Sequence, residues 1–118
     1  YISRICEAID EVPITVFAKG AWWVLEDMKD LACNTIGLDW NMNPLKAKKV
    51  LPDKTLQGNL DPCALYGSEE SIRSEVTALL RNFEGTPHIA NLGHGVYPDT
   101  DPEKVKFFVK QIKELSSN

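Results

Sequence analysis

The chain has 118 residues, 43% of them hydrophobic, and 13 basic against 17 acidic side chains give it a net charge of -4. This length and apolar content suffice for one domain with a buried core. The charges are mixed along the chain, which argues against a nucleic-acid partner because such proteins cluster Lys and Arg. No apolar run approaches the length of a membrane-spanning helix, so we expect no membrane partner. No charged and then apolar leader stands at the start, which is Tyr1 and not a methionine.

The three cysteines, Cys6, Cys33 and Cys63, are far apart and stand outside any CxxC or CxxH spacing. An odd number of scattered cysteines predicts reduced thiols, as in a cytosolic protein. A zinc site needs ligands at closer spacing, and only two histidines are present to supplement the thiols. We therefore expect no metal site.

The first part of the chain predicts a helix, a strand, a second helix and a second strand. Residues 1–10 carry apolar residues at helical spacing and predict the end of a helix. Residues 14–18 (ITVFA) are continuously apolar, as in a strand that is covered on both faces. Residues 22–32 predict a helix, and residues 35–39 (TIGLD) predict the next strand. The apolar stripe of the first helix comprises Ile2, Ile5, Cys6 and Ile9.

The third unit has clear boundaries. Asn43 is a good N-cap and Pro44 suits the first helical position, so a short helix is expected from there to Val50. Residues 55–59 (TLQGN) predict the third strand, and Ser68, followed by two glutamates, predicts the start of the helix after it. The expected buried stripe of that helix, which Gly85 closes, is Ile72, Val76, Leu79, Leu80 and Phe83.

The last strand and helix complete the pattern. Residues 88–92 (HIANL) predict the fourth strand. The final helix begins either at Asp101 with Pro102 or through a capping box of Thr100 and Glu103. Its expected buried stripe is Val105, Phe108, Val109, Ile112 and Leu115. Several residues inside the later strands are unusual for a plain sheet core and suggest a tight or functional interior. They are Gly37, Gln57, Gly58, Asn59 and Asn91.

A helix end followed by four βα units predicts the C-terminal half of a (β/α)8 TIM barrel, an α/β fold, with four parallel strands in chain order. We expect the whole chain, residues 1–118, to belong to one such barrel domain. A small open α/β sheet, complete in itself, is the alternative. No GxGxxG or P-loop follows the first strand, where Lys19 and Gly20 form only a weak signal.

The two histidines stand at opposite ends of the fourth strand. Chemistry gathers at the carboxyl ends of the strands in such sheets, so His88, at the amino end, is expected to be a surface residue or the first residue of the strand. His94 lies at the carboxyl end between Gly93 and Gly95, which let the backbone turn sharply and approach a ligand. His94 is therefore the candidate site residue, and local hydrogen bonding of its ring is the alternative.

Other polar residues are expected at the same mouth. Lys19, Asp39, Asn59 and Asp61 each follow or end a predicted strand, so their loops converge with that of His94. Each also has a plainer interpretation, because Asp61 suits a turn, Asp39 suits a helix cap and Lys19 suits a solvated position.

Four segments of the chain, VPITVFAKG, IGLDW, LQGNLDPCALYGSEE and HIANLGHGVYPDTDPEKVKFFV, resemble the uroporphyrinogen decarboxylase family and occur in its order, over residues 12–115. The resemblance implies a (β/α)8 barrel of which this chain supplies strands five to eight. It implies decarboxylation of the four acetate side chains of uroporphyrinogen to give coproporphyrinogen, on the route to haem and chlorophyll. It also implies a cytoplasmic homodimer, with a plastid location left open, that uses no cofactor.

Residue by residue, the resemblance assigns His94 to substrate binding and assigns no catalytic residue to this chain. The family's catalytic aspartate and substrate-binding arginines lie in the N-terminal half. Asp39 and Asp61 match family positions but are expected to be structural supports. The isolated chain is expected to be inactive. Because of its exposed strand edges, it is expected to associate with a copy of itself or with the N-terminal half, or to persist only as a loose, partly ordered unit.

Two alternatives stand beside the decarboxylase. Corrinoid-dependent methyltransferases resemble the same pattern but tend to have a cysteine, part of a zinc site, in the place of His94. A half-barrel without catalysis, acting as a scaffold or a tetrapyrrole-binding module, is the other alternative.

Overall fold

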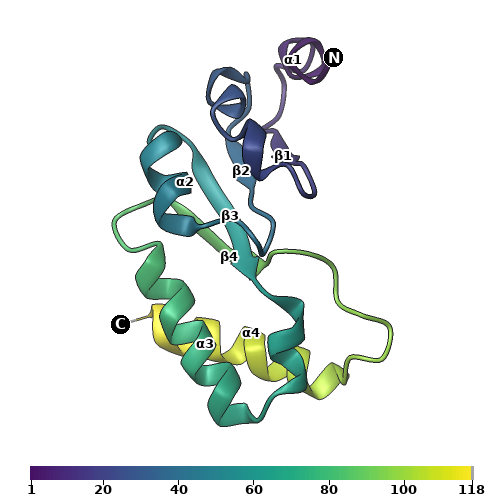
Figure 1. Cartoon of the computed structure of the whole chain (residues 1–118), viewed down its shortest axis with the longest axis vertical. Coiled ribbons are helices and arrows are strands. Elements are labelled where there is room, and N and C mark those ends of the chain that lie inside the picture. Colours follow the sequence, from purple (N-terminus) through teal and green to yellow (C-terminus); the bar gives the residue numbers. More distant parts are fainter. Residues whose placement is uncertain (118) are drawn as a thin grey trace.

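The structure, a computed structural model, describes residues 1–117. Their strands form one parallel sheet with helices packed against it (Figure 1). The strands are β1 (Thr15–Phe17), β2 (Thr35–Gly37), β3 (Thr55–Leu60) and β4 (His88–Leu92). The α-helices are α1 (Ile2–Glu7), α2 (Pro44–Val50), α3 (Glu69–Asn82) and α4 (Pro102–Ser116), and the 3₁₀ helices are η1 (Trp22–Val24), η2 (Asp27–Asp30) and η3 (Pro62–Tyr66).

The sheet has the strand order β1-β2-β3-β4, and each neighbouring pair is parallel. The prediction of four parallel strands in chain order is confirmed. β1 and β4 are the outer strands, so each pairs with one neighbour only in this part of the chain. The carboxyl ends of all four strands consequently lie at one rim of the sheet.

One face of the sheet is buried and the other is open. On the buried face, strand side chains such as Ile36 and Leu56 pack against the apolar faces of α2, α3 and α4. On the opposite face the side chains of Phe17 and Ile89 remain 46% and 45% exposed. Such an exposed apolar sheet face is typical of an element that lacks its packing partner.

Side-chain caps fix the starts of the two long helices. The Ser68 hydroxyl accepts a hydrogen bond from the backbone N–H of Ser71 at 3.1 Å and caps α3. The Asp101 carboxylate accepts from the N–H of Glu103 at 2.9 Å and caps α4, with Pro102 at the first helical position. The Asp101 alternative is therefore confirmed over the capping box of Thr100.

The helix predicted over residues 22–32 is wrong in kind, because the chain forms the two short 3₁₀ helices η1 and η2 there. The buried side chains of these residues are Leu25 and Met28, three positions apart. Val24 and Leu31 also pack against the core, so apolar residues 24, 25, 28 and 31 have the spacing of an amphipathic α-helix, and the apolar pattern does not explain the 3₁₀ geometry. Trp22 and Trp23 point to solvent and are 57% and 71% exposed.

Two predicted stripes are corrected as well. In α1 only Cys6 is buried, while Ile2, Ile5 and Ile9 are exposed, because this short helix lies beyond β1 at the end of the molecule opposite α3 and α4 (Figure 1). In α4 Val109 is 43% exposed. The polar residue Gln111, two positions further along α4, is buried instead and is 2% exposed.

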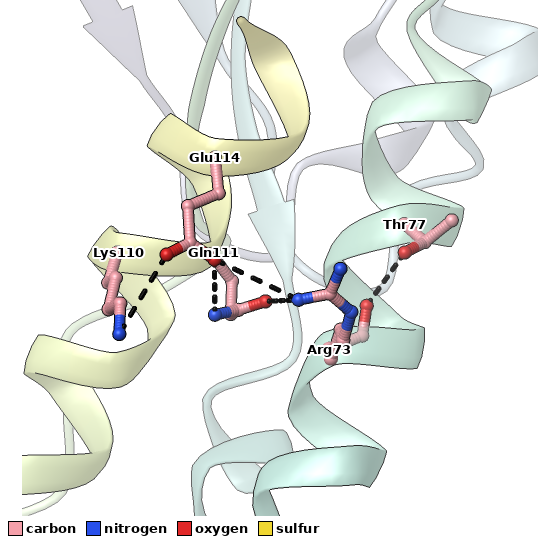
Figure 2. Close-up of polar contacts among 5 residues, drawn as sticks. All are labelled: Arg73, Thr77, Lys110, Gln111 and Glu114. Carbon is pink, nitrogen blue, oxygen red and sulfur yellow. Dashed lines mark hydrogen bonds and ion pairs between the residues drawn. The ribbon is translucent and has the colours of Figure 1, made fainter. Parts of the chain in front are cut away.

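Gln111 is buried because α3 supplies a partner for its amide (Figure 2). The Arg73 guanidinium donates to Gln111 Oε1 at 2.5 Å, and Gln111 Nε2 donates to Glu114 Oε2 at 3.1 Å. Glu114 also pairs with Arg73 and Lys110 at 3.8 Å each. This network joins α3 to α4 at a point where the apolar stripe is interrupted.

Substitution of Arg73 tests the network. Arg73→Ala leaves the buried oxygen of Gln111 without its donor, so we expect the free energy of unfolding to fall by about 1–3 kcal/mol. Lys106→Ala is the control, because it removes an exposed ion pair with Glu103 and is expected to cost under about 1 kcal/mol. Urea denaturation of both variants measures this, and equal losses would contradict the account.

Candidate functional site

The rim at the carboxyl ends of the strands is joined by a buried amide. Asn59, at the end of β3, is 7% exposed, and its Nδ2 donates to the backbone carbonyls of Asp39 at 3.0 Å and Met42 at 2.8 Å. Both hydrogens of the amide are thereby used, and both carbonyls belong to the loop that follows β2. Asn59 therefore fixes that loop to the end of the next strand.

Asp39 extends the connection to the loop after β1. Its Oδ2 accepts a hydrogen bond from the backbone N–H of Gly20 at 2.7 Å, and the residue is 2% exposed. Its Oδ1 is buried and has no hydrogen-bond partner among residues 1–117. Lys19, next to Gly20, is exposed. Asp61 caps η3 by accepting from the N–H of Cys63 at 2.9 Å, so both aspartates support the backbone of the rim.

Gly93 joins the fourth loop to the same structure. Its N–H donates to the carbonyl of Leu60 at 2.8 Å. A Cβ on Gly93 would lie 2.3 Å from the backbone nitrogen of Trp40, closer than any real contact. Only glycine therefore permits the backbone after β4 to lie against the loop after β2. This close approach determines where the next residue, His94, leaves the sheet.

His94 lies at an open cavity of about 420 Å³ on the rim. Its ring is exposed and meets the ring of Phe17 edge to face, with centroids 6.5 Å apart. The cavity is lined on the sheet side by Phe17, Gln57 and Asn91, and on the other side by apolar residues of α4. An imidazole, two amides and an aromatic ring thus face one space, as the polar residues inside the later strands suggested.

The other histidine has a structural role at the far end of β4. His88 Nε2 lies 2.6 Å from the carbonyl of Gly58, and its ring stacks on Phe83 with centroids 3.9 Å apart. Burial lowers the pKa of His88, and the hydrogen bond to Gly58 opposes this shift only in part. The expectation that His88 is a surface residue or the first residue of the strand is confirmed in its second form, because His88 begins β4 and its ring is half-buried.

One cluster near the site was not predicted. The hydroxyl of Tyr66, in η3, donates to Asp99 Oδ1 at 2.5 Å, and its ring stacks on Tyr97 with centroids 6.2 Å apart. Both partners belong to the loop that carries His94. Because Tyr66 and Asp99 are 33 positions apart, no periodicity or spacing in the sequence could have signalled the contact.

Metal ligands do not gather in the described part of the chain. No group of three or more His, Cys, Asp or Glu side chains within residues 1–117 could hold a metal ion. Cys6, Cys33 and Cys63 are all free, and only Cys63 is exposed. None of the helices described is both long and apolar enough to cross a membrane.

Consecutive parallel βα units with polar residues at the carboxyl rim define a part of a TIM barrel. A solved structure, a methyltransferase from Methanosarcina mazei, shares this fold with a TM-score of 0.81 and 22% sequence identity, over 98% of this chain and 34% of that one. The family model described as Uroporphyrinogen decarboxylase (URO-D) matches residues 1–115. The chain belongs to the uroporphyrinogen decarboxylase family.

Curated relatives agree with this family. The uroporphyrinogen decarboxylase of Danio rerio is 49% identical over 92% of this chain and 30% of its own length. That of Homo sapiens is 46% identical over 97% of this chain and 32% of its length, and that of Chlorobaculum parvum is 41% identical over 98% and 34%. The chain spans about a third of the length of the relatives that it matches.

The close approach of Gly93 gives a direct test of the rim. Gly93→Ala places a methyl group inside the backbone of Trp40, so we expect it to lower the free energy of unfolding by about 2–4 kcal/mol. Gly95→Ala is the matched control, because a Cβ there meets no atom within 4 Å. Thermal and urea unfolding of the two variants compare them, and a Gly93→Ala variant as stable as Gly95→Ala would disprove the constraint.

Proposed function

We propose that this chain forms strands five to eight of a (β/α)8 uroporphyrinogen decarboxylase and that His94 binds the substrate. The enzyme removes the four acetate carboxyl groups of uroporphyrinogen as CO₂ and leaves methyl groups in their place, which gives coproporphyrinogen. The observation that carries the proposal is the place of His94. In a member of this family, it lines an open cavity at the rim where TIM barrels perform their chemistry.

The chemistry of the cavity suits a tetrapyrrole that carries carboxylates. An exposed imidazole donates a hydrogen bond to a carboxylate, and it does so more strongly when it is protonated. The amides of Gln57 and Asn91 are further donors on the same wall, and the ring of Phe17 offers an apolar surface to the macrocycle. Together these groups bind and orient the substrate.

The remaining groups of the active site come from outside this chain. The protonated pyrrole that accepts the electrons of the departing carboxyl group needs a nearby carboxylate, which the family's N-terminal half provides together with its arginines. The open face of the sheet around Ile89 and the outer edges of β1 and β4 are covered by that half. The full-length enzyme is a homodimer, and the isolated chain has no decarboxylase activity.

A methyltransferase function is the weaker candidate. The likeness to the enzyme of Methanosarcina mazei concerns the fold, at 22% identity. The relatives at 41–49% identity are decarboxylases.

The two histidines provide the experiment. In the full-length protein, His94→Asn removes a hydrogen bond to a charged group, so we expect kcat/KM for uroporphyrinogen to fall about tenfold or more. His88→Asn is the control, because that ring packs in the core, and turnover per folded enzyme should remain nearly unchanged. The assay follows the loss of each acetate carboxyl group. Equal effects of the two substitutions would refute the assignment of His94.

A further inference from the structure

The loop that carries His94 is held at both ends. Residues 93–101 connect β4 to α4 and form the long excursion seen at the side of the molecule (Figure 1). At its start, the N–H of Gly93 donates to Leu60, and at its end Asp101 caps α4. The side chains of residues 94–99 are exposed. Burial therefore does little to fix the middle of the loop.

Tyr66 contacts this middle part twice. Its hydroxyl donates to Asp99 at 2.5 Å, and its ring stacks on that of Tyr97 at an interplanar angle of 20°. The hydrogen bond to Asp99 raises the pKa of the Tyr66 hydroxyl, and a tyrosine hydroxyl is a protonated donor at neutral pH even without such a shift. One side chain from outside the loop thus engages two of its residues.

The support of Tyr66 is rigid. It is the last residue of η3, which is anchored by the buried side chains of Pro62 and Leu65 and capped by Asp61. With Tyr97 and Asp99 attached to this support, the stretch left free after Gly93 is residues 94–96. Without it, Asp99 loses its partner in η3 and Tyr97 keeps only the contact of its hydroxyl with Cys63, so the free stretch is longer. A longer free stretch has more conformations to lose when a ligand binds.

We propose that Tyr66 is a positioning residue that latches the loop of residues 93–101 to η3 and so presents His94 to the substrate. The latch consists of the hydrogen bond to Asp99 and the stack on Tyr97. The inference rests on the proposed function in one respect, because the substrate contact of His94 belongs to that proposal. The latch itself is a property of the folded chain and is measured without substrate.

Hydrogen exchange in the full-length protein tests the latch. Tyr66→Phe keeps the ring stack and removes the hydrogen bond, so backbone amides of residues 93–101 should exchange about fivefold faster, the factor for one ordinary hydrogen bond. Tyr1→Phe is the control. It also removes a phenol hydroxyl, but from a fully exposed residue that precedes α1, so exchange of residues 93–101 should not change.

A double-mutant cycle isolates the pair. Asp99→Ala removes the acceptor and should accelerate exchange as much as Tyr66→Phe does. The double variant should be no faster than either single variant, because the same bond is lost once. Additive effects, or unchanged exchange in Tyr66→Phe, would overturn the latch. Both single variants remove the same hydrogen bond, so if one of them impairs folding, the other still tests the latch.

Kinetics test the positioning role. Tyr66→Phe should raise KM for uroporphyrinogen about fivefold and change kcat by less than about twofold, because the residue orders a binding group and touches no reacting atom. An unchanged KM with faster loop exchange, in an enzyme that His94→Asn impairs, would overturn positioning and leave the proposed function intact. A full-length protein without decarboxylase activity would refute the proposed function, and the exchange data would then decide the latch alone.

Discussion

The amide of Asn59 is the interaction on which the rim of the sheet depends. It donates both of its hydrogens to backbone carbonyls of the loop after β2, in a place shielded from water. Loss of the amide would leave two carbonyls unpaired, at a cost of about 1–3 kcal/mol for each buried one. It would also release Trp40, against whose backbone Gly93 packs. The position of His94 therefore depends on the hydrogen bonds of Asn59 to the loop after β2, although His94 itself lies in the loop after β4.

This arrangement gives several polar residues and a glycine of the rim a structural role. Asp39 holds the first loop through Gly20, Asn59 holds the second loop, and Gly93 lets the fourth loop lie against it. A binding group that leaves the sheet from such a rigid frame loses little conformational freedom on meeting its ligand. The exposed loop beyond His94 is the less constrained part, and it is there that Tyr66 adds a contact from η3.

Much of the fold could be predicted because local physics agrees with the tertiary structure. The four strands follow from apolar runs, and the caps by Ser68 and Asp101 follow from side chains that satisfy the first N–H groups of their helices. The 3₁₀ helices after β1 could not be predicted, because the apolar residues 24, 25, 28 and 31 have the spacing of an α-helix. The burial of Gln111 could not be predicted either, because it depends on a hydrogen bond from Arg73, which is 38 positions away.

The candidate site could likewise be predicted from the sequence only in part. The carboxyl-end rule separated His94 from His88, and polar residues within strands pointed to Gln57 and Asn91, which line the cavity. The stack of His88 on Phe83 and the latch by Tyr66 could not be predicted, because both are contacts between elements. The most direct test of the account is a structure of the full-length protein with coproporphyrinogen bound. We predict that a ring nitrogen of His94 lies within hydrogen-bonding distance, about 3 Å, of a tetrapyrrole carboxylate. A tetrapyrrole bound away from the rim that Asn59 and Gly93 organise, with His94 facing solvent, would contradict it.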